Sequence, residues 1–281
     1  GAGVKVILMT MLIEVLIFTM ITFMILRKKK KRLFMYPPTV SILNVNIDNV
    51  DYNETLEMIV KAIEDGKKGY IITANSLMVM SGISNLLFKR ILKDALVVTP
   101  DGIGLIWASN FLGTPLKTRV TGIDLTRRLL RLASLKGYRV YLLGGSPGIT
   151  TKVKMGLEEN YPGIKIVGSG HGYFSKKEEV LLIEEIRSTM PDLIFVGFGS
   201  PHQEKWINRN YHAFDRGIFL GVGGSFDVIS GQVKRAPAFF QRLGLEWLFR
   251  LLKEPYRWRR MLVLPKFIWY ILIQRMLNDA E

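Results

Sequence analysis

The sequence predicts an α/β domain with a mainly parallel β-sheet and helices on both of its faces. Three observations predict it: apolar runs of four to six residues recur along the chain, helical stretches separate them, and most runs end in a glycine-rich or polar turn. Strands that are apolar on both sides belong in a sheet covered by two helical layers. This arrangement is Rossmann-like, and 281 residues with 48% hydrophobic content are enough for its core.

The elements of this core follow one another within residues 36–231, which we assign to one domain. The segment "TVSILNVNID" is a strand candidate, and a helix over residues 52–64 follows it. Further strands are predicted in "GYIITANSLMVM", "ALVVTPDGIG", "YRVYLLGGSPG", "IKIVGSGHGYF", "DLIFVGFGSP" and "GIFLGVGGSFD".

Residues 1–35 differ from this core in composition. Residues 6–26 are apolar except for Glu14 and three threonines, which is close to the roughly 20 residues that a helix needs to cross a bilayer. The basic run Arg27 to Arg32 follows at once, as expected for a cytoplasmic flank. Glu14 argues against this, because a carboxylate at mid-membrane costs roughly 2.5–3.5 kcal/mol. A cleaved signal peptide is the alternative, but a signal peptide has its basic residues before the apolar run, whereas here they follow it. The sequence predicts a transmembrane anchor.

Residues 232–281 have no strand–turn signature and predict helices broken near Pro255 and Pro265. Aromatic residues alternate there with arginine and lysine, which is typical of an amphipathic helix at a membrane interface. The alternative is an ordinary C-terminal helix with a solvated basic face. We predict a helical membrane-binding appendage.

The charge is concentrated in two segments. The chain carries +15, with +6 in Arg27 to Arg32, and the stretch Gln232 to Lys266 holds nine Lys or Arg and two Glu. This indicates an anionic partner: phospholipid, a phosphorylated substrate or nucleic acid. Nucleic acid is disfavoured, because the basic residues adjoin apolar segments and no recognition motif is present. The absence of cysteine excludes disulfides and thiolate sites, and three histidines disfavour a histidine-rich metal site.

Five predicted strands end in loops suited to a ligand: "TANS", "TPDGIG", "GGSPG", "GFGSPHQ" and "GVGGSFD". In parallel sheets, ligands bind beyond the carboxyl ends of the strands. Glycines such as Gly144, Gly145 and Gly199 let backbone N–H groups approach a ligand closely. The GxGxxG and P-loop fingerprints are absent. The five loops together predict a nucleotide pocket.

Asp101, in "VVTPDGIG", is a lone carboxylate at the end of a predicted strand. No Ser-His-Asp grouping surrounds it, and no DxD or HxH pair indicates a metal held by side chains. A solitary carboxylate suits a general base acting on a hydroxyl group. The alternative is a turn or N-cap aspartate with no chemical role.

Thr73 and Asn75 lie at the end of a neighbouring predicted strand, and Arg119, Gln203 and His202 are further polar candidates. Thr73 and Asn75 could orient a sugar hydroxyl or an acetamido group, and Arg119 could offset phosphate charge. Gln203 could hydrogen-bond a sugar. His202 is either structural or an acid–base residue.

Together, "ITANSLMVM", "VVTPDGIGLIWAS", "RVTGIDL", "VYLLGGSPG", "FVGFGSPHQEKWI" and the segment from "GVGGSFD" to "YRWRR" resemble the WecG/TagA/CpsF family of glycosyltransferases. The resemblance runs from about Val45 to Arg260. It implies transfer of an N-acetylmannosaminyl sugar from UDP-N-acetylmannosamine to a polyprenyl-diphosphate-linked sugar, with inversion and without a metal held by side chains. For the TagA-like branch the acceptor is N-acetylglucosaminyl-diphospho-undecaprenol, in β-1,4 linkage, and the product starts the wall teichoic acid linkage unit. The resemblance also implies a place at the cytoplasmic face of the cell membrane.

Carried over by motif, the resemblance implies that the catalytic aspartate is Asp101. It implies further contacts to substrate, nucleotide or lipid diphosphate from Thr73, Asn75, Arg119, Gln203, Asp227, Arg250, Arg257 and Arg260. The hydrophobic N-terminal segment is not part of the family's core pattern. We also expect the appendage to fold over the Asp101 pocket and complete the active site.

Several alternatives stay open at this point. The chain could be a related UDP-sugar transferase of exopolysaccharide or enterobacterial-common-antigen type, or a membrane-anchored nucleotide-binding protein without catalysis. The donor epimer, the acceptor sugar and a homo-oligomer are likewise undecided. No cofactor is expected beyond the UDP-sugar donor, and phospholipid is the expected surface partner.

Overall fold

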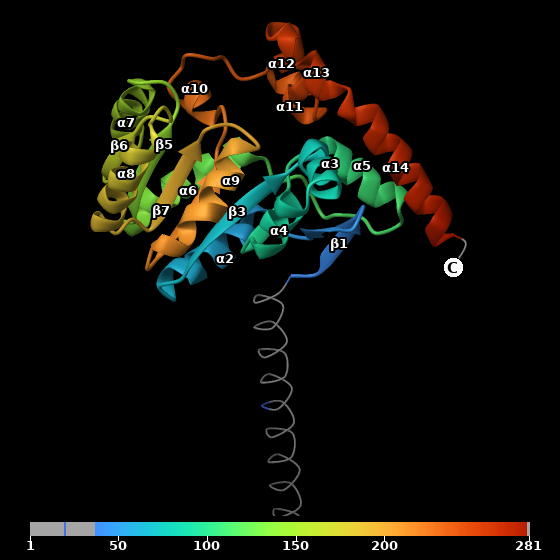
Figure 1. Ribbon diagram of the computed structural model, residues 1–281, viewed down its shortest axis with the longest axis horizontal. Coiled ribbons are helices and arrows are strands. Elements are labelled where there is room, and N and C mark those ends of the chain that lie inside the picture. Colours follow the sequence, from blue (N-terminus) through green and yellow to red (C-terminus); the bar gives the residue numbers. More distant parts are fainter. Residues whose placement is uncertain (1–19, 21–36, 280–281) are drawn as a thin grey trace, which may run out of the picture. The chain divides into compact units, whose positions relative to one another are not determined.

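The computed structural model describes residues 37–279 and Met20. These residues contain a six-stranded parallel sheet. The strand order is β4-β3-β8-β7-β5-β6, and every neighbouring pair is parallel (Figure 1). The predicted α/β fold is therefore confirmed. The strands are β3 (Lys68–Ala74), β4 (Val97–Pro100), β5 (Arg139–Gly144), β6 (Lys165–Gly170), β7 (Leu193–Gly197) and β8 (Gly217–Gly221).

Helices cover both faces of this sheet, and alternate strand residues separate into two apolar clusters. Ile72 and Tyr141 point to one cluster, whereas their neighbours Ile71 and Leu142 point to the other. The first face is covered by α3 (Ser76–Ser84), α4 (Leu86–Asp94), α5 (Ile103–Phe111), α8 (Lys176–Ser188) and α9 (His202–Asn210). The second is covered by α2 (Tyr52–Glu64), α6 (Gly122–Lys136), α7 (Ile149–Asn160) and α10 (Ser225–Ile229).

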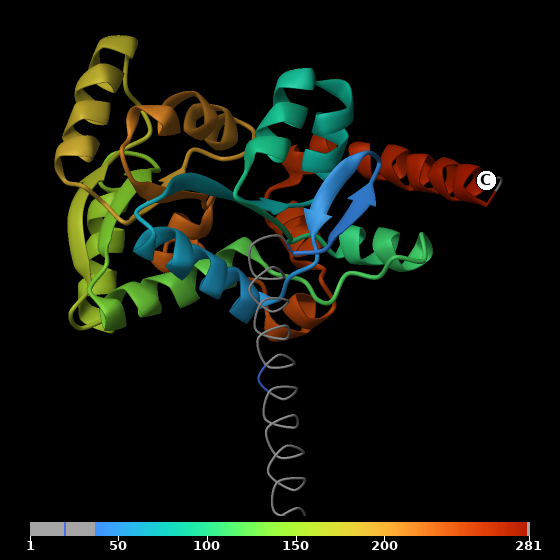
Figure 2. The ribbon, with the colours of Figure 1, turned by 90° about the horizontal axis from the view of Figure 1, so that it is seen from below.

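The segment "TVSILNVNID" is a hairpin, so our expectation of one strand was wrong. β1 (Thr39–Ile42) and β2 (Val45–Asp48) pair antiparallel outside the main sheet, beside α5 (Figure 2). Leu43 and Asn44 form the turn with φ of 52° and 60°, the left-handed geometry that suits a two-residue hairpin. The sequence signal is the three-residue step between the buried Ile42 and Val45, which breaks the period of two.

The hairpin also covers the edge of the sheet. The Asp48 carboxylate accepts a hydrogen bond from the Val98 amide at 2.7 Å, on the outer strand β4. Burial raises the pKa of Asp48 to about 6. A free strand edge invites pairing with other chains, and this contact closes it.

The predicted C-terminal appendage, which we call the tail, is helical as expected. Its helices are α11 (Ala238–Arg242), α12 (Glu246–Lys253), η2 (Pro255–Arg257), α13 (Trp258–Met261) and α14 (Val263–Asn278). Pro255 begins a new turn. Pro265 lies in the first turn of α14, where a missing N–H costs no hydrogen bond, so the break falls just before it, at Leu262. The buried Phe267 and Ile271 pack α14 against α3 and α5.

No helix among residues 37–279 is long and apolar enough to cross a membrane. The predicted transmembrane segment, residues 6–26, lies outside the described residues apart from Met20. The tail nevertheless exposes many large apolar side chains on α13 and α14 and beside them: Trp258, Leu262, Ile268, Trp269, Tyr270, Leu272, Ile273, Met276 and Leu277.

Candidate active site

The carboxyl ends of β3 and β4 bring Asp101 together with Thr73 and Asn75. The two strands are in register, with Thr73 opposite Thr99, and the Asp101 amide donates to the Ala74 carbonyl at 2.8 Å. A Cβ on Gly102 would lie 3.0 Å from the Asn75 Cβ, so these loops touch. The Asn75 Oδ1 caps α3 by accepting from the amides of residues 77 and 78, which leaves its amide nitrogen for a ligand.

Among residues 37–279, the Asp101 carboxylate accepts a hydrogen bond at one of its two oxygens. Its Oδ2 accepts from the Gly122 amide at 3.2 Å, at the start of α6. A Cβ on Gly122 would lie 2.9 Å from Thr73 Oγ1 and 3.6 Å from Asp101 Oδ2, so a larger residue would displace the Thr73 hydroxyl. Asp101 is not an N-cap, because α5 begins after Gly102 without a side-chain cap. Oδ1 is therefore available to a substrate hydroxyl.

The surroundings of Asp101 make it a stronger base than an ordinary aspartate. Burial raises its pKa to about 6, while the Gly122 amide acts to lower it. Arg119 and Arg250 also lower the pKa, and Glu246 raises it. A carboxyl group with this pKa is largely ionised at neutral pH, yet it accepts a proton more readily than a solvent-exposed one.

Arg119 connects this loop to the tail. Its Nη2 donates to the Gln241 carbonyl at 3.1 Å and faces Glu246 Oε1 at 3.4 Å. Gly244, with φ of 70°, crosses so closely that a Cβ there would lie 2.7 Å from Ile103 Cβ and 2.8 Å from Arg119 Nη1. The segment of α11 and α12 thus packs beside Asp101, and the partner of Arg119 here is a carboxylate.

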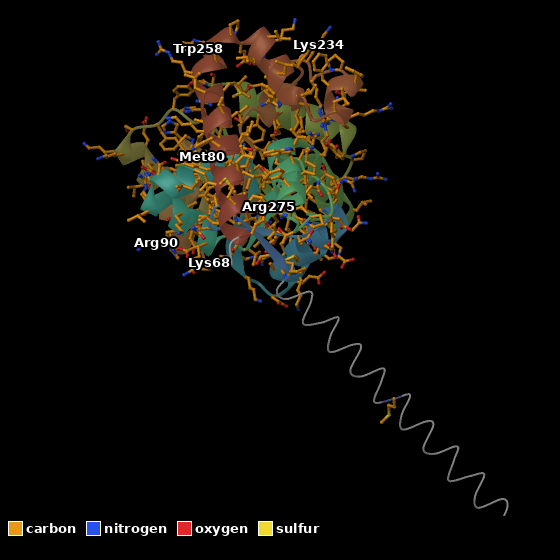
Figure 3. The ribbon with its side chains drawn as sticks, turned by 90° about the vertical axis from the view of Figure 1, so that its right-hand side faces the viewer. Lys68, Met80, Arg90, Lys234, Trp258 and Arg275 are labelled. Atoms are coloured by element: carbon orange, nitrogen blue, oxygen red, sulfur yellow. The ribbon has the colours of Figure 1, made fainter. Side chains whose placement is uncertain are left out.

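The side-chain view agrees with this placement. Within the domain, Lys234 and Trp258 of the tail lie at one end, whereas Lys68, the first residue of β3, lies toward the other, nearer to Arg275 of α14 (Figure 3). The first part of the tail, as far as α13, therefore lies toward the carboxyl ends of the strands.

Sequence reasoning missed Arg235. Its guanidinium holds the Asp124 carboxylate with two hydrogen bonds, at 2.7 and 2.8 Å, and its Nε faces Glu246 Oε2 at 3.3 Å. Asp124 lies in the first turn of α6, three residues after the N-cap Thr121. Arg235 thereby ties α6 to α12 next to Asp101. The only available signal was Glu246, one of two acids in the basic segment 232–266.

Gln203 is buried and holds the loop after β8. Its Oε1 accepts from the Gly223 amide at 2.9 Å, and its Nε2 donates to Glu204 Oε1 at 2.8 Å. Burial raises the pKa of Glu204. Sequence reasoning did not identify Glu204 as part of this site. The structure gives Gln203 a positioning role, and its contact with a sugar stays a prediction.

Glycine plays different structural roles at the three predicted positions in the neighbouring loops. A Cβ on Gly144 would lie 2.6 Å from the backbone of Gly197, and the Gly145 amide donates to the Gly197 carbonyl at 3.0 Å, so both serve the β5–β7 contact. Gly199, with φ of 75°, has nothing within 4 Å of its Cβ position, and its carbonyl accepts from the Gln203 amide at 3.0 Å. Asp227 is half-buried on α10, beyond β8. Because β8 is parallel to β3, these loops lie at the same carboxyl ends of the strands as Asp101.

The remaining predicted residues have exposed side chains where the structure describes them. His202 is exposed at the start of α9, and Arg250 and Arg260 are exposed on the tail. The Arg257 side chain lies outside what the structure describes. Within the described part of the chain, no three His, Asp or Glu side chains come together as a metal site requires.

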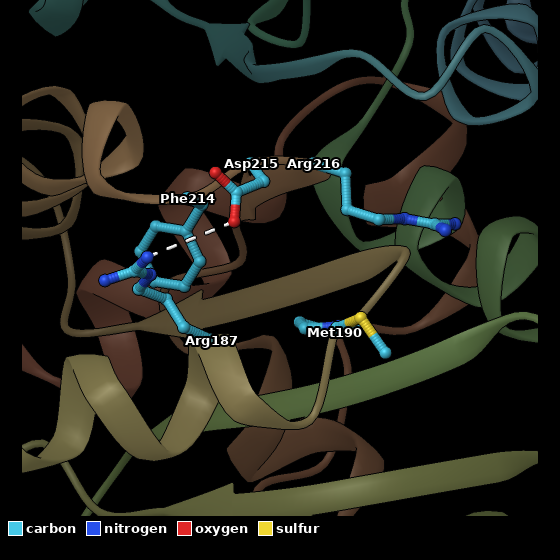
Figure 4. A pocket seen from close by; sticks show the side chains of 6 residues that line it. Arg187, Met190, Phe214, Asp215 and Arg216 are labelled. Carbon is cyan, nitrogen blue, oxygen red and sulfur yellow. Dashed lines mark ion pairs between the residues drawn. The ribbon is translucent and has the colours of Figure 1, made fainter.

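A small cavity of about 50 Å³ lies at the other end of the sheet (Figure 4). It is lined by residues before β7 and β8, among them Arg187, Met190 and Asp215, and the Arg187–Asp215 pair spans 4.0 Å. The amino ends of the strands are remote from Asp101, so we place the active site at the carboxyl ends.

Comparison with known proteins shows the family of this chain. The family model described as "Glycosyl transferase WecG/TagA/CpsF family" matches residues 40–281. The chain belongs to this family. Similar proteins are the N-acetylglucosaminyldiphosphoundecaprenol N-acetyl-beta-D-mannosaminyltransferases of three bacteria. The Bacillus spizizenii protein is 39% identical over 75% of this chain and 81% of its own length. The Bacillus subtilis and Staphylococcus aureus proteins are 36% and 33% identical, each over 83% of this chain and 91% of its own length.

Proposed function

We propose that this member of the WecG/TagA/CpsF family transfers N-acetylmannosamine from UDP-N-acetylmannosamine to N-acetylglucosaminyl-diphospho-undecaprenol, as in teichoic acid linkage-unit synthesis. The observation that carries the proposal is the half-buried Asp101 carboxylate, with one oxygen held and one available, at the ligand-binding edge of the sheet. The names and the 33–39% identity of the relatives support the choice of donor and acceptor.

Asp101 acts as the general base in this reaction. It takes the proton of the acceptor hydroxyl as that oxygen attacks the anomeric carbon of the donor sugar. The bond from this carbon to the diphosphate oxygen breaks, and UDP leaves with the bonding electrons. The new glycosidic bond forms on the opposite face, so the configuration inverts. Asp101 then releases the proton to water.

The negative charge on the departing UDP requires neutralisation. Arg119 lies next to the Asp101 loop, because the Val120 amide donates to the Pro100 carbonyl at 2.7 Å, and Arg250 lies on α12, one turn after Glu246. Guanidinium groups bind phosphate oxygens through paired hydrogen bonds and supply this stabilisation without a metal. Activity should therefore persist in excess EDTA. Loss of activity that Mg²⁺ or Mn²⁺ specifically restores would contradict a metal-independent mechanism.

The surface of the tail suits an acceptor embedded in a membrane. Trp258, Trp269 and Met276 are 53%, 63% and 72% exposed, and Arg259 and Arg260, which follow Trp258 in the sequence, are exposed as well. We assign the tail to the phospholipid interface and residues 6–26 to a transmembrane anchor, with the catalytic domain on the cytoplasmic face of the cell membrane.

The direct test is UDP release with a short-chain lipid-diphosphate-GlcNAc acceptor. Release that requires both the acceptor and UDP-N-acetylmannosamine is the expected result. Release with UDP-N-acetylglucosamine but not with UDP-N-acetylmannosamine would contradict the assigned donor. Absence of release with both donors would contradict the proposed function.

A further inference from the structure

Glu246 is an unusual residue for its place. It begins α12 in a segment, residues 232–266, that holds nine basic residues and only one other acid, Glu254. Its side chain is 20% exposed and points toward the core, where Arg119 and Arg235 are 20% and 14% exposed. Two guanidinium groups thus converge on a single partly buried carboxylate.

The distances show that this carboxylate is held loosely. Glu246 faces Arg119 at 3.4 Å and Arg235 at 3.3 and 3.5 Å. By contrast, Arg235 holds Asp124 at 2.7 and 2.8 Å. Charge-assisted hydrogen bonds have a usual length of about 2.7–2.9 Å, so the Asp124 pair has full contact and the Glu246 pairs do not.

The geometry of Arg235 allows a change of partner. A guanidinium carries five N–H donors, and Asp124 uses one from each terminal nitrogen. The donors that face Glu246 are the Nε–H and the second hydrogen of Nη2. If Glu246 withdrew, Asp124 would still orient Arg235, and this pair of donors would match two phosphate oxygens.

The position of the cluster is equally specific. Arg119 and Glu246 both act on the Asp101 carboxylate, as does Arg250, one turn after Glu246 on α12. In the proposed reaction, on which this inference rests, the diphosphate and the base lie on either side of one sugar ring. The Val120 amide donates to the Pro100 carbonyl at 2.7 Å, so Arg119 lies next to the loop that carries Asp101. An anion-binding pair of arginines at this place suits the diphosphate.

We infer that Glu246 occupies a phosphate subsite formed by Arg119 and Arg235, and that a substrate diphosphate displaces it. The tail carboxylate keeps the two guanidinium groups neutralised and oriented while the site is empty. Displacement of Glu246 releases the start of α12 from the core, so binding of the diphosphate and movement of α12 are coupled. The diphosphate belongs either to the nucleotide donor or to the lipid-linked acceptor.

The test is a binding measurement and needs no turnover. Glu246→Gln removes the competing charge and keeps the shape of the side chain, so the affinity for a diphosphate should rise about three- to tenfold. Calorimetry with inorganic pyrophosphate, UDP and farnesyl diphosphate shows which of these compounds binds more tightly to the variant than to the unaltered protein. A gain with UDP alone assigns the subsite to the donor, and a gain with farnesyl diphosphate alone assigns it to the acceptor. Uridine, which lacks phosphate, should bind both proteins equally.

Glu254→Gln is the matched control, because it makes the same charge change in the same tail. Glu254 lies at the end of α12 and accepts a hydrogen bond from the Tyr256 hydroxyl at 2.7 Å. Diphosphate affinity should not change in this variant. An equal gain in both variants would assign the effect to general charge, and no gain or a loss in Glu246→Gln would overturn the inference.

A second measurement uses the unaltered protein and does not depend on the folding of a variant. Pyrophosphate should accelerate amide hydrogen exchange across α12, because the ion pairs at its first turn are lost. Exchange in α6, where Arg235 keeps its contact with Asp124, should not accelerate. Unchanged or slower exchange in α12 at saturating pyrophosphate would contradict displacement. If these binding results hold but no sugar is transferred, the proposed function fails and the phosphate subsite stands.

Discussion

The two halves of the tail are attached to the sheet domain by different forces. α14 is attached through Phe267 and Ile271, which are 1% and 0% exposed in the same apolar cluster as the sheet. α12 is attached beside Asp101 by the ion pairs of Glu246 with Arg119 and Arg235. A buried apolar contact offers no charged group that an anion could bind, whereas partly exposed ion pairs can exchange partners. The difference indicates that α14 is the fixed part and α12 the part that responds to substrate.

The largest expected effect concerns Asp101, in the sheet domain beside which α12 is attached. Asp101→Asn should keep the fold and UDP binding but lower turnover by roughly 10²–10⁴-fold, the usual range for a general base. The measurement is single-turnover transfer to a short-chain acceptor. Asp215→Asn, the same substitution in an exposed loop at the far end of the sheet, should have no effect. Near-normal turnover in Asp101→Asn would remove Asp101 as the base and direct attention to His202.

Phe267→Ala tests whether α14 is fixed by burial. Removing this side chain should lower the free energy of unfolding by about 3–5 kcal/mol, because it leaves a cavity in the core. Trp269→Ala, two residues further on and 63% exposed, should change it by less than about 0.5 kcal/mol. Urea unfolding without lipid measures both. Equal losses in the two variants would mean that α14 is not attached as described.

Gly244→Ala tests the α12 side. Its Cβ would collide with Ile103 and Arg119, so α11 and α12 should loosen at a cost of about 1–3 kcal/mol. Gly231→Ala is the control, because Gly231 also has a positive φ, 77°, but nothing within 4 Å of its Cβ position. Hydrogen exchange should accelerate in α12 for Gly244→Ala and stay unchanged in α14. Equal effects of the two substitutions would show that backbone strain, and not the contact with Arg119, dominates.

The smallest effect concerns stability at the site itself. The pKa of Asp101 in the folded protein, about 6, lies above its ordinary value of 3.8, so folding favours the protonated form. Its contribution is fully present below about pH 3.8 and is lost as the pH rises through about 6. Asp101→Asn should therefore gain on the order of 1–2 kcal/mol relative to the unaltered protein near pH 7, and much less near pH 4. Thermal unfolding at both pH values checks this, and a pH-independent difference would contradict it.

The sheet and the Asp101 loop were predictable from the sequence because their signals are local. An apolar run followed by "TPDGIG" places a carboxylate at a strand end, and the neighbouring "TANS" places Thr73 and Asn75 beside it. The hairpin was missed because its turn, Leu43 and Asn44, contains neither glycine nor proline.

The contacts of Arg119 and Arg235 were not predictable in this way. Arg119 and Glu246 are 127 positions apart, and Asp124 and Arg235 are 111 apart. No local pattern indicates which acid an arginine will face, because the pairing depends on where α6 and α12 lie after folding. Gln203 is similar: its motif is visible in the sequence, but its bonds to Gly223 and Glu204 depend on burial.

The pH dependence of kcat/KM for UDP release tests the central claim, that Asp101 is the base, most directly. Because kcat/KM reports the ionisation of the free enzyme, it should rise with pH and reach half its plateau near the pKa of Asp101, about 6. The residual activity of Asp101→Asn should lack this rise. A flat profile between about pH 5 and 8 in the unaltered protein, or the same rise in Asp101→Asn, would contradict the assignment.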